Sequence, residues 1–446
     1  MQDALVPRRK LVRTFSLGGA AFASLLLASG ALAQDVGSVV SESGLVSTAG
    51  KFRLKGEFRV NGRSSRDETL TFTPAAPAQP FNETVVSPHS SFEISNVAIV
   101  GEGDFTPDIS GRVVVHFIDL YTRNPTSAGV TVSVREAWLR FGRKFESLTP
   151  IPGTTLYIQA GKAPRFHKQV LRKLESYGLW GTAVARLEEV GVELGGTLGR
   201  NVYWRGAVSN GNPLFLRDPN ALSGNNGALD RTTNAAITSG FPILYEARAD
   251  DFNTRGQFQY GGGLGFRFNF GEAKKNGVDV LGWYFQRTLA ERPTSELDLL
   301  RGFGGVSLPL DGTDKTTIGV NLEARFGGLQ LFGQFIHEDI AGFVRKGFEA
   351  EAAFRIPLNG VFASGDTSVL NWIQPTVRVS QFDVEFAPAG YFAPSIGWDW
   401  TKYDFGFRLG IVRGIDFTAE YSRHDVTSKA RVIHPDEFLA TLRVGF

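Results

Sequence analysis

A run of basic side chains occupies residues 162–173, and its residue types suit the attraction of anions. It supplies five full positive charges and one histidine within twelve residues, before the first acidic residue, Glu175. In a narrow, water-filled passage with low-dielectric walls, such charges focus the electric field and concentrate anions, and their spacing lets an anion move from one to the next. On a solvated external loop they would have no such effect. The six residues are Lys162, Arg165, His167, Lys168, Arg172 and Lys173.

A second set of basic residues occurs in segments where polar and apolar side chains alternate. We expect four of them to form a basic track that leads toward the first run. Acidic residues such as Glu57 occupy comparable positions. Oppositely charged side chains on neighbouring strands often pair and stabilise a sheet, so pairing within the wall is the alternative role for each of them. The four residues are Arg53, Lys55, Arg59 and Arg140.

The elements that must position these residues are strands. From residue 51 onward, apolar and polar side chains alternate with a period of two, which gives a strand one apolar and one polar face. In 316–326, for example, Val320 and Leu322 alternate with Asn321 and Glu323. The pattern predicts sixteen strands, with ends uncertain by a few residues. They lie near 51–60, 91–102, 111–121, 131–142, 154–161, 188–198, 201–209, 256–270, 278–287, 316–326, 329–338, 345–356, 370–381, 399–411, 413–423 and 436–446.

The connections between these strands tend to alternate in length. Short ones hold turn residues, such as Gly327-Gly328 and Arg413-Gly414, whereas most of the intervening ones are longer. Lipid offers no hydrogen-bond partners to the backbone, so a sheet spans a membrane only when its first and last strands pair. An even number of strands lets them pair antiparallel. The sequence therefore predicts an all-β, sixteen-stranded antiparallel transmembrane β-barrel in the bacterial outer membrane, in contact with outer-membrane lipid.

A secreted β-sandwich is the alternative fold, because it also shows alternation and turns. It would bury its apolar face and would need no aromatic girdle at the membrane interface. Several predicted strands carry aromatic residues near an end, including Trp138, Tyr203 and Trp283. Such residues suit a membrane interface. Together with the pattern of connection lengths, they favour the barrel.

The amino-terminal residues 1–33 contain the basic, apolar and small-residue parts of an export signal. We expect a short periplasmic segment at 34–50 and the barrel at 51–446. The signal holds four of the 47 Lys and Arg residues and one of the 45 acidic residues, so the remaining chain has a net charge of −1. A nucleic-acid-binding protein would show a basic excess, and nucleic acid is therefore excluded as a partner. The absence of cysteine excludes a disulfide framework.

Several motifs resemble the phosphate-selective porin family. They are concentrated in residues 131–211, and the aromatic terminal residue Phe446 resembles the end of other outer-membrane proteins. The resemblance implies a sixteen-stranded homotrimeric channel. The motifs are Arg135-Glu136-Ala137-Trp138-Leu139-Arg140-Phe141, Leu156-Tyr157-Ile158-Gln159-Ala160-Gly161-Lys162, Glu189-Val190-Gly191-Val192-Glu193-Leu194-Gly195-Gly196 and Tyr203-Trp204-Arg205-Gly206-Ala207-Val208-Ser209-Asn210-Gly211.

The resemblance also assigns a role to the first basic run. If the first strand starts in the periplasm, 162–187 is the third long loop, which in porins of this size folds into the lumen and constricts it. The six basic residues of this loop are then expected to set anion selectivity. We expect a porin for passive diffusion of small hydrophilic solutes, with a preference for phosphate-like anions and with no cofactor.

Two further interpretations remain open. One is a general or sugar-preferring porin of the same fold, in which acidic residues of the wall neutralise the loop cations. The other is a surface binding protein that does not conduct ions. An enzyme is not expected, because none of the six histidines stands in a nucleophile, zinc or phosphate-loop motif.

Overall fold

The structure is a computed structural model that describes most of the chain from Lys51 to Phe446. The predicted export signal at 1–33 and the segment 34–50 lie outside the described residues. Across the part that is described, no helix has both the length and the apolar character needed to cross a membrane. The described residues are 51–65, 68–72, 81–86, 89–118, 132–146, 148–167, 173–176, 178–180, 188–212, 214–217, 243–246, 257–271, 276–289, 311–358, 362–364, 367–385, 398–428 and 431–446.

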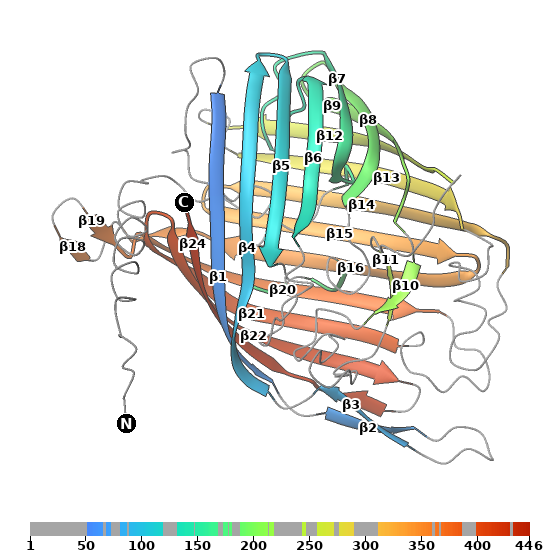
Figure 1. Ribbon diagram of the computed structural model, residues 1–446, viewed down its shortest axis with the longest axis vertical. Coiled ribbons are helices and arrows are strands. Elements are labelled where there is room, and N and C mark those ends of the chain that lie inside the picture. The colour runs from blue at the N-terminus through green and yellow to red at the C-terminus, as the bar shows by residue number, and fades with distance from the viewer. Residues whose placement is uncertain are drawn as a thin grey trace, which may run out of the picture.

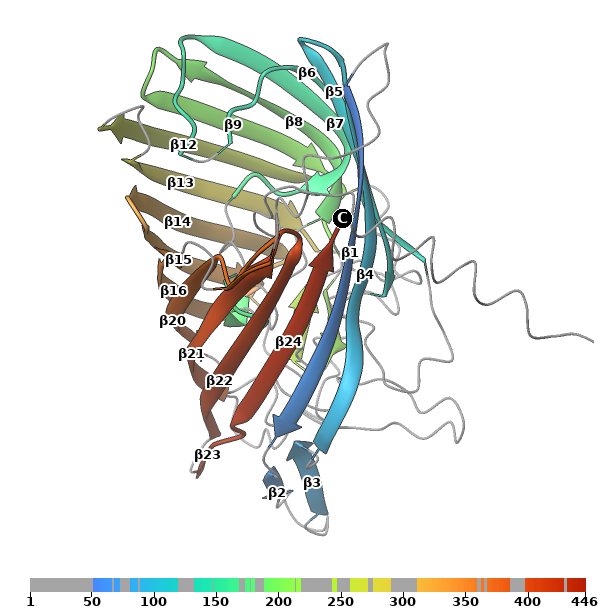
Figure 2. The ribbon, with the colours of Figure 1, turned by 90° about the vertical axis from the view of Figure 1, so that its left-hand side faces the viewer.

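Sixteen long strands follow one another around a closed antiparallel wall (Figure 1 and Figure 2). They correspond one to one with the predicted strands, so the predicted fold class is confirmed. The strands are β1 Lys51–Ser65, β4 His89–Thr106, β5 Ile109–Ile118, β6 Ser133–Gly142, β7 Thr155–Pro164, β8 Glu188–Leu198, β9 Val202–Ser209, β12 Gln259–Phe270, β13 Asn276–Thr288, β14 Asp314–Phe326, β15 Leu329–Ile340, β16 Phe343–Phe354, β20 Trp372–Val384, β21 Trp398–Val412, β22 Ile415–Ser428 and β24 Glu437–Gly445.

The first strand closes the ring by pairing with β4 on one side and with the last strand, β24, on the other. In the β1–β24 pair, Val60 is opposite Leu442. The carboxyl-terminal Phe446 extends this pairing through two backbone hydrogen bonds with Gly56, at 2.7 and 3.0 Å. Closure therefore gives both edge strands a hydrogen-bonded neighbour, which is what a sheet in lipid requires.

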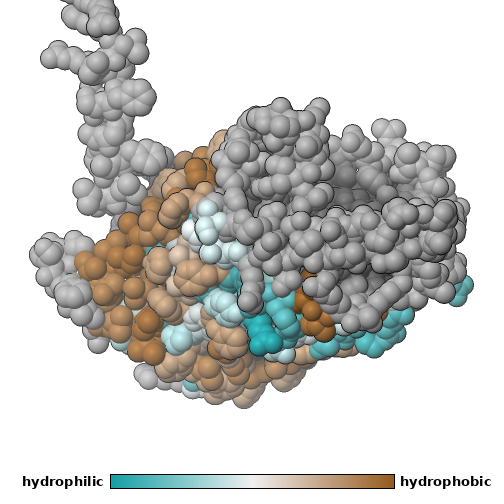
Figure 3. Space-filling model, turned by 90° about the horizontal axis from the view of Figure 1, so that it is seen from below, coloured by the Kyte–Doolittle hydropathy of each residue, from teal (hydrophilic) through white to brown (hydrophobic). Residues whose placement is uncertain are grey.

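The two faces of the wall have opposite character. Outward side chains are apolar and exposed, such as Leu322 at 43%, whereas the inward Asn321 and Glu323 are 0% and 6% exposed. Hydrophobic residues cover much of the outer wall that Figure 3 shows. This distribution is the reverse of that in a β-sandwich, which buries its apolar face. It suits a wall with lipid outside and polar groups inside.

Aromatic residues mark both borders of the outward apolar band. Exposed phenylalanines stand where strands reach the turn side, among them Phe141, Phe326 and Phe354, and exposed tyrosines stand nearer the loop side, such as Tyr260 and Tyr284. These are the girdles expected at membrane interfaces.

Three aromatic residues that we assigned to the girdle face inward instead. Tyr203 donates a hydrogen bond to Asp279, and Trp283 donates one to Asn321. Trp138 donates one to the inward Glu136. Their positions near strand ends do not reveal which face they occupy, and each has a polar atom that is satisfied inside the barrel.

Shorter strands lie outside the ring or extend it. The β2–β3 hairpin projects beyond the end of β1 and β4 (Figure 2). Two more hairpins pair within the connections β9–β12 and β16–β20. The short strands are β2 Glu68–Phe72, β3 Phe81–Val86, β10 Leu214–Arg217, β11 Ile243–Glu246, β17 Ile356–Pro357, β18 Phe362–Ser364, β19 Thr367–Val369 and β23 Arg431–Ile433.

The turn side of the barrel is less uniform than the sequence pattern suggests. The β14–β15 and β21–β22 turns are tight, and their glycines Gly327 and Gly414 have φ of 59° and 82°, which favours glycine. However, the connections β6–β7 and β16–β20 are much longer. The expectation of short links holds for only part of this side, and the β6–β7 connection has consequences for the lumen.

Candidate functional site

The connection between β7 and β8 crosses the barrel interior and contacts strands on the opposite wall. Its described residues 173–176 and 178–180 hydrogen-bond with inward side chains of β1, β4, β16, β20, β21 and β22. Of these strands, β16, β20, β21 and β22 lie on the opposite side of the ring from β7 and β8, whereas β1 and β4 are nearer to β7. The candidate functional site is therefore the part of the lumen between this segment and the wall.

The first anchor of the segment is the carboxylate of Glu420 on β22. One oxygen accepts the backbone N–H of Glu175 at 2.5 Å, and the other accepts that of Ser176 at 2.8 Å. Arg378 on β20 donates to the carbonyl and hydroxyl oxygens of Ser176 at 2.8 and 2.9 Å. Two consecutive backbone donors and one carbonyl are thus satisfied by charged groups of the wall, which form the stronger class of hydrogen bond.

The second anchor lies three residues farther along. The backbone N–H of Trp180 donates to Glu349 at 2.9 Å, and its indole N–H donates to the carbonyl of Gln381 at 3.0 Å. The Trp180 ring packs edge-on against Phe382, with ring centroids 5.6 Å apart. Leu179 is fully buried beside it. The segment is therefore held by both hydrogen bonds and apolar contacts.

Arg165 lies in a buried ion-pair network at the start of the same connection. Its guanidinium donates to Glu189 at 2.5 Å and to Glu246 at 2.6 Å. Lys315 also binds Glu246, at 2.6 Å. Burial alone would lower the pKa of Arg165, but the two carboxylates raise it above its ordinary value. Arg165 is charged, but its charge is shared with acidic neighbours.

Glu246, on β11, accepts bonds from more than one cation. Burial would raise the pKa of its carboxyl, but Arg165 and Lys315 lower it below the ordinary range. Arg287 stands 3.8 Å away as a third positive neighbour. The β10–β11 hairpin therefore brings a full negative charge to the base of the loop.

His167 contributes no charge near neutral pH. Its ring stacks on Trp283, with centroids 4.4 Å apart, and contacts Phe285 edge-on. Burial, with a further contribution from nearby Arg165, lowers its pKa to about 3. The neutral ring acts as an aromatic contact that packs the loop against β13.

The remaining residues of the basic run occupy different surroundings. Lys162 stands on β7 in register with the outward Val190, and its ammonium donates to the carbonyl of Val134. Lys173 is 4% exposed and lines a cavity inside the barrel. Lys168 and Arg172 lie outside the described residues. The structure thus brings Arg165 and His167 together at β13 and does not bring Lys162 to them.

The four residues of the expected basic track differ in their pairing. Lys55 bonds to Glu102 at 2.7 Å, and Arg53 lies 3.4 Å from the same carboxylate. Arg59 pairs with Glu57. Arg140 bonds to the neutral Gln159, at 2.6 and 2.9 Å, and its guanidinium stands 4.4 Å from the centre of the Trp138 ring. Three of the four cations are therefore neutralised within the wall.

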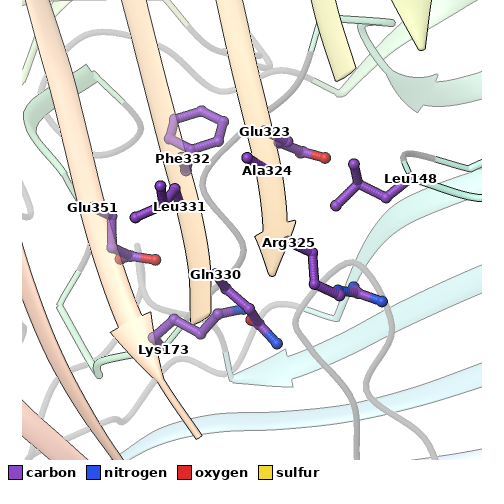
Figure 4. Close-up of a pocket in the computed structure, with 9 residues that line it drawn as sticks. All are labelled: Leu148, Lys173, Glu323, Ala324, Arg325, Gln330, Leu331, Phe332 and Glu351. Carbon is purple, nitrogen blue, oxygen red and sulfur yellow. The ribbon is translucent and has the colours of Figure 1, made fainter. Parts of the chain in front are cut away.

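A small cavity of about 30 Å³ lies where the loop segment approaches β14, β15 and β16 (Figure 4). It has room for ordered water. Its charged lining is balanced, with two basic and two acidic residues. Figure 4 shows Arg325 extending from β14 toward the side of Leu148 and Lys173 lying beside Gln330. The lining residues are Leu148, Lys173, Glu323, Ala324, Arg325, Gln330, Leu331, Phe332 and Glu351.

Sequence reasoning missed the acidic residues that organise this site. Alternation along the sequence puts residues such as Glu420 and Glu349 on the polar face of their strands. It gave no indication that they hold a loop whose backbone is more than 160 residues away in sequence, as the separations of 245 and 169 residues show. Glu246 lies within a predicted long loop, where no periodic pattern marked it.

Comparison with known proteins supports the fold. No family model matches the chain, and a search of curated proteins also found no match. The outer membrane channel DcaP of Acinetobacter baumannii is a structural neighbour with a TM-score of 0.51 and 9% identity, over 91% of this chain and all of that one. OprB of Pseudomonas putida, in its high pH structure, has a TM-score of 0.50 and 10% identity, over 89% of this chain and 94% of that one.

At these identities the likeness shows the fold alone. The closed wall and its outward apolar band agree with it. The chain therefore has the fold of outer-membrane porins and belongs in the bacterial outer membrane.

Proposed function

We propose that this protein is a porin through which small hydrophilic solutes diffuse passively, with a modest preference for anions. The observation that carries the proposal is the loop segment, residues 173–176 and 178–180, which crosses a polar, charge-lined interior and is anchored to the opposite wall. Such a segment would narrow the passage through the barrel. Solutes would be selected by size and by the field of the charges that line the passage.

The proposed preference is modest because most inward cations have acidic partners. Arg165, Lys315 and Arg378 are each paired with one or more carboxylates. Arg140 and Arg325 form no ion pair with a carboxylate among the described residues, so they contribute most directly to a positive potential. A preference for phosphate itself rests on the family resemblance, and Lys168 and Arg172 would have to support it.

The pairing also favours a second candidate, a general or sugar-preferring channel of the same fold. In such a channel the size of the passage would matter more than its charge. The ion pairs of Arg165, Lys315 and Arg378 leave fewer full charges to act on a solute.

A homotrimer is the proposed assembly, by resemblance to the same family. The exposed apolar band offers each barrel an outer surface that can face either lipid or another copy. Size determination in a mild detergent tests this part independently of transport.

Reconstitution into planar bilayers tests the proposed function. Stepwise ion conductance is expected, together with a reversal potential in a salt gradient that has the sign of anion preference. Arg140→Gln and Arg325→Gln should each move the reversal potential toward cations. Lys162→Gln, which removes an outward charge, is the matched control and should leave it unchanged. Absence of conductance steps would favour a binding protein, and a reversal potential near zero would favour the general or sugar-preferring channel.

A further inference from the structure

The β6–β7 connection, residues 143–154, is a turn-side segment that enters the barrel. Antiparallel neighbours can be joined by two to five residues, yet twelve residues separate Gly142 from Thr155. Two of them, Pro150 and Pro152, lack the N–H that a sheet ladder needs. The chain therefore leaves the wall here, and its described residues are 143–146 and 148–154.

Both ends of the segment are fixed to the inner wall. Lys144 pairs with the inward Glu193 of β8 at 2.8 Å. The Gly153 carbonyl accepts the hydroxyl of Thr197 at 2.5 Å. Ile151, between them, is 4% exposed and belongs to the buried apolar cluster of the interior. These contacts direct the segment into the barrel rather than away from it.

The middle of the segment reaches β12 and β13. Arg267 donates to the carbonyl of Thr149, and Asn269 donates to that of Leu148, both at 2.8 Å. The backbone N–H of Leu148 donates a hydrogen bond to a carboxylate oxygen of Asp279, at 3.5 Å. The segment thus covers the inner face from β8 to β13 at the turn side, with its backbone groups satisfied by wall side chains.

Leu148 extends from this segment toward the cavity of Figure 4. The cavity is bordered on one side by Leu148, on another by Lys173 from the loop segment, and on the wall by Arg325, Gln330 and Phe332. Two inward-folded segments, one from each side of the barrel, therefore approach the same region. An apolar tip at such a point restricts solutes by size and by its poor wetting.

We propose that the described residues of this segment, 143–146 and 148–154, form a second constriction on the turn side and that Leu148 sets the size limit there. The proposal rests on the proposed function, since it assumes that solutes cross the lumen. In an outer-membrane barrel the turn side faces the periplasm. Solutes that pass the loop segment would then meet a second selecting point before they leave the channel.

Cysteine modification tests the proposal, because the chain contains no cysteine of its own. Leu148→Cys is treated, during bilayer recording, with a small water-soluble thiol reagent applied from one side and then from the other. A stepwise loss of conductance is expected, and the reaction should be faster when the reagent is applied from the turn side than from the loop side. Leu156→Cys is the matched control, since this nearby leucine faces outward and is 63% exposed. Conductance of Leu156→Cys should be unchanged by the reagent.

A second variant guards against a folding defect. Leu148 has φ of 59°, a conformation that glycine adopts more readily than leucine. Leu148→Gly should therefore fold, and its single-channel conductance and size cut-off should both rise. Unchanged conductance in Leu148→Gly, together with no loss on modification of Leu148→Cys, overturns the second constriction. Absence of conductance in the unmodified protein would instead overturn the proposed function.

Discussion

Glu420 is the wall residue whose substitution should most directly loosen the loop segment. Its two carboxylate oxygens accept the backbone N–H groups of Glu175 and Ser176, at 2.5 and 2.8 Å. In Glu420→Gln, one oxygen remains as an acceptor, and the other is replaced by an amide group that can only donate. One of the two backbone donors then loses its partner inside the barrel, while the shape of the side chain is nearly unchanged.

The size of the effect follows from the number of bonds lost. A hydrogen bond to a charged group contributes about 1.5–3 kcal/mol net. Losing one of them raises the ratio of released to anchored loop by about 10- to 150-fold, since 1.4 kcal/mol corresponds to a factor of ten. Arg378 and the Trp180 contacts still hold the segment, so the protein should remain folded. The change should appear as motion of the constriction rather than as loss of the barrel.

Single-channel recording measures this motion. Glu420→Gln should show larger current fluctuations and a higher maximum conductance than the unchanged protein. Glu102→Gln is the matched control, because it removes an inward carboxylate that pairs with Lys55 and Arg112, on the wall. If the currents of both variants fluctuate equally, the effect comes from the lost negative charge and not from release of the loop segment. If Glu420→Gln records like the unchanged protein, the anchor is not what fixes the constriction.

Three further outcomes follow from individual contacts. Glu246→Gln removes a carboxylate that Arg165 and Lys315 share. The free energy of unfolding in detergent should fall by about 3 kcal/mol, the lower end of the range for a broken buried ion pair. An unchanged free energy of unfolding would contradict the ion-pair network. Burial lowers the pKa of His167 from 6.5 to about 3. Its contribution to stability is therefore fully present above pH 6.5 and falls by about 1.4 kcal/mol per pH unit between pH 6.5 and about 3. Acid titration of His167→Phe should lack this dependence. Leu322→Arg places a charge on the outward face and should cost about 2–4 kcal/mol in lipid-refolding experiments, whereas a tolerated arginine would argue that this face does not contact lipid.

The strands could be predicted because one physical requirement acts on every residue of the wall. Each outward side chain must suit lipid and each inward one must suit a polar interior, so the period of two persists through elements such as β14 and β24. The strand ends could not be located as well. Beyond the lipid the outward face no longer needs to be apolar, and β1 and β4 continue pairing as far as Ser65 and His89.

The partners of the loop cations could not be predicted, because they depend on contacts between distant residues. Arg165 reads as a free cation in the sequence, but it bonds to Glu246, which is 81 positions away on a hairpin inside a long connection. His167 reads as a member of the basic run, but burial against Trp283 keeps it neutral. Charge counted along a loop therefore overstates the charge that a solute meets in the lumen.

The same reasoning explains why the two segments inside the barrel differ in chemistry. The loop segment presents two backbone N–H groups to Glu420 and one carbonyl to Arg378. The turn-side segment presents two carbonyls to Arg267 and Asn269 and one N–H to Asp279. Each wall side chain thus matches the unsatisfied backbone groups of the segment that it faces, as buried backbone requires. A segment with Pro150 and Pro152 has fewer N–H groups to satisfy and so needs fewer wall carboxylates. The distribution of charge on the inner wall is therefore determined partly by the need to hold these segments, and only the remaining charges, such as those of Arg140 and Arg325, are left to act on solutes.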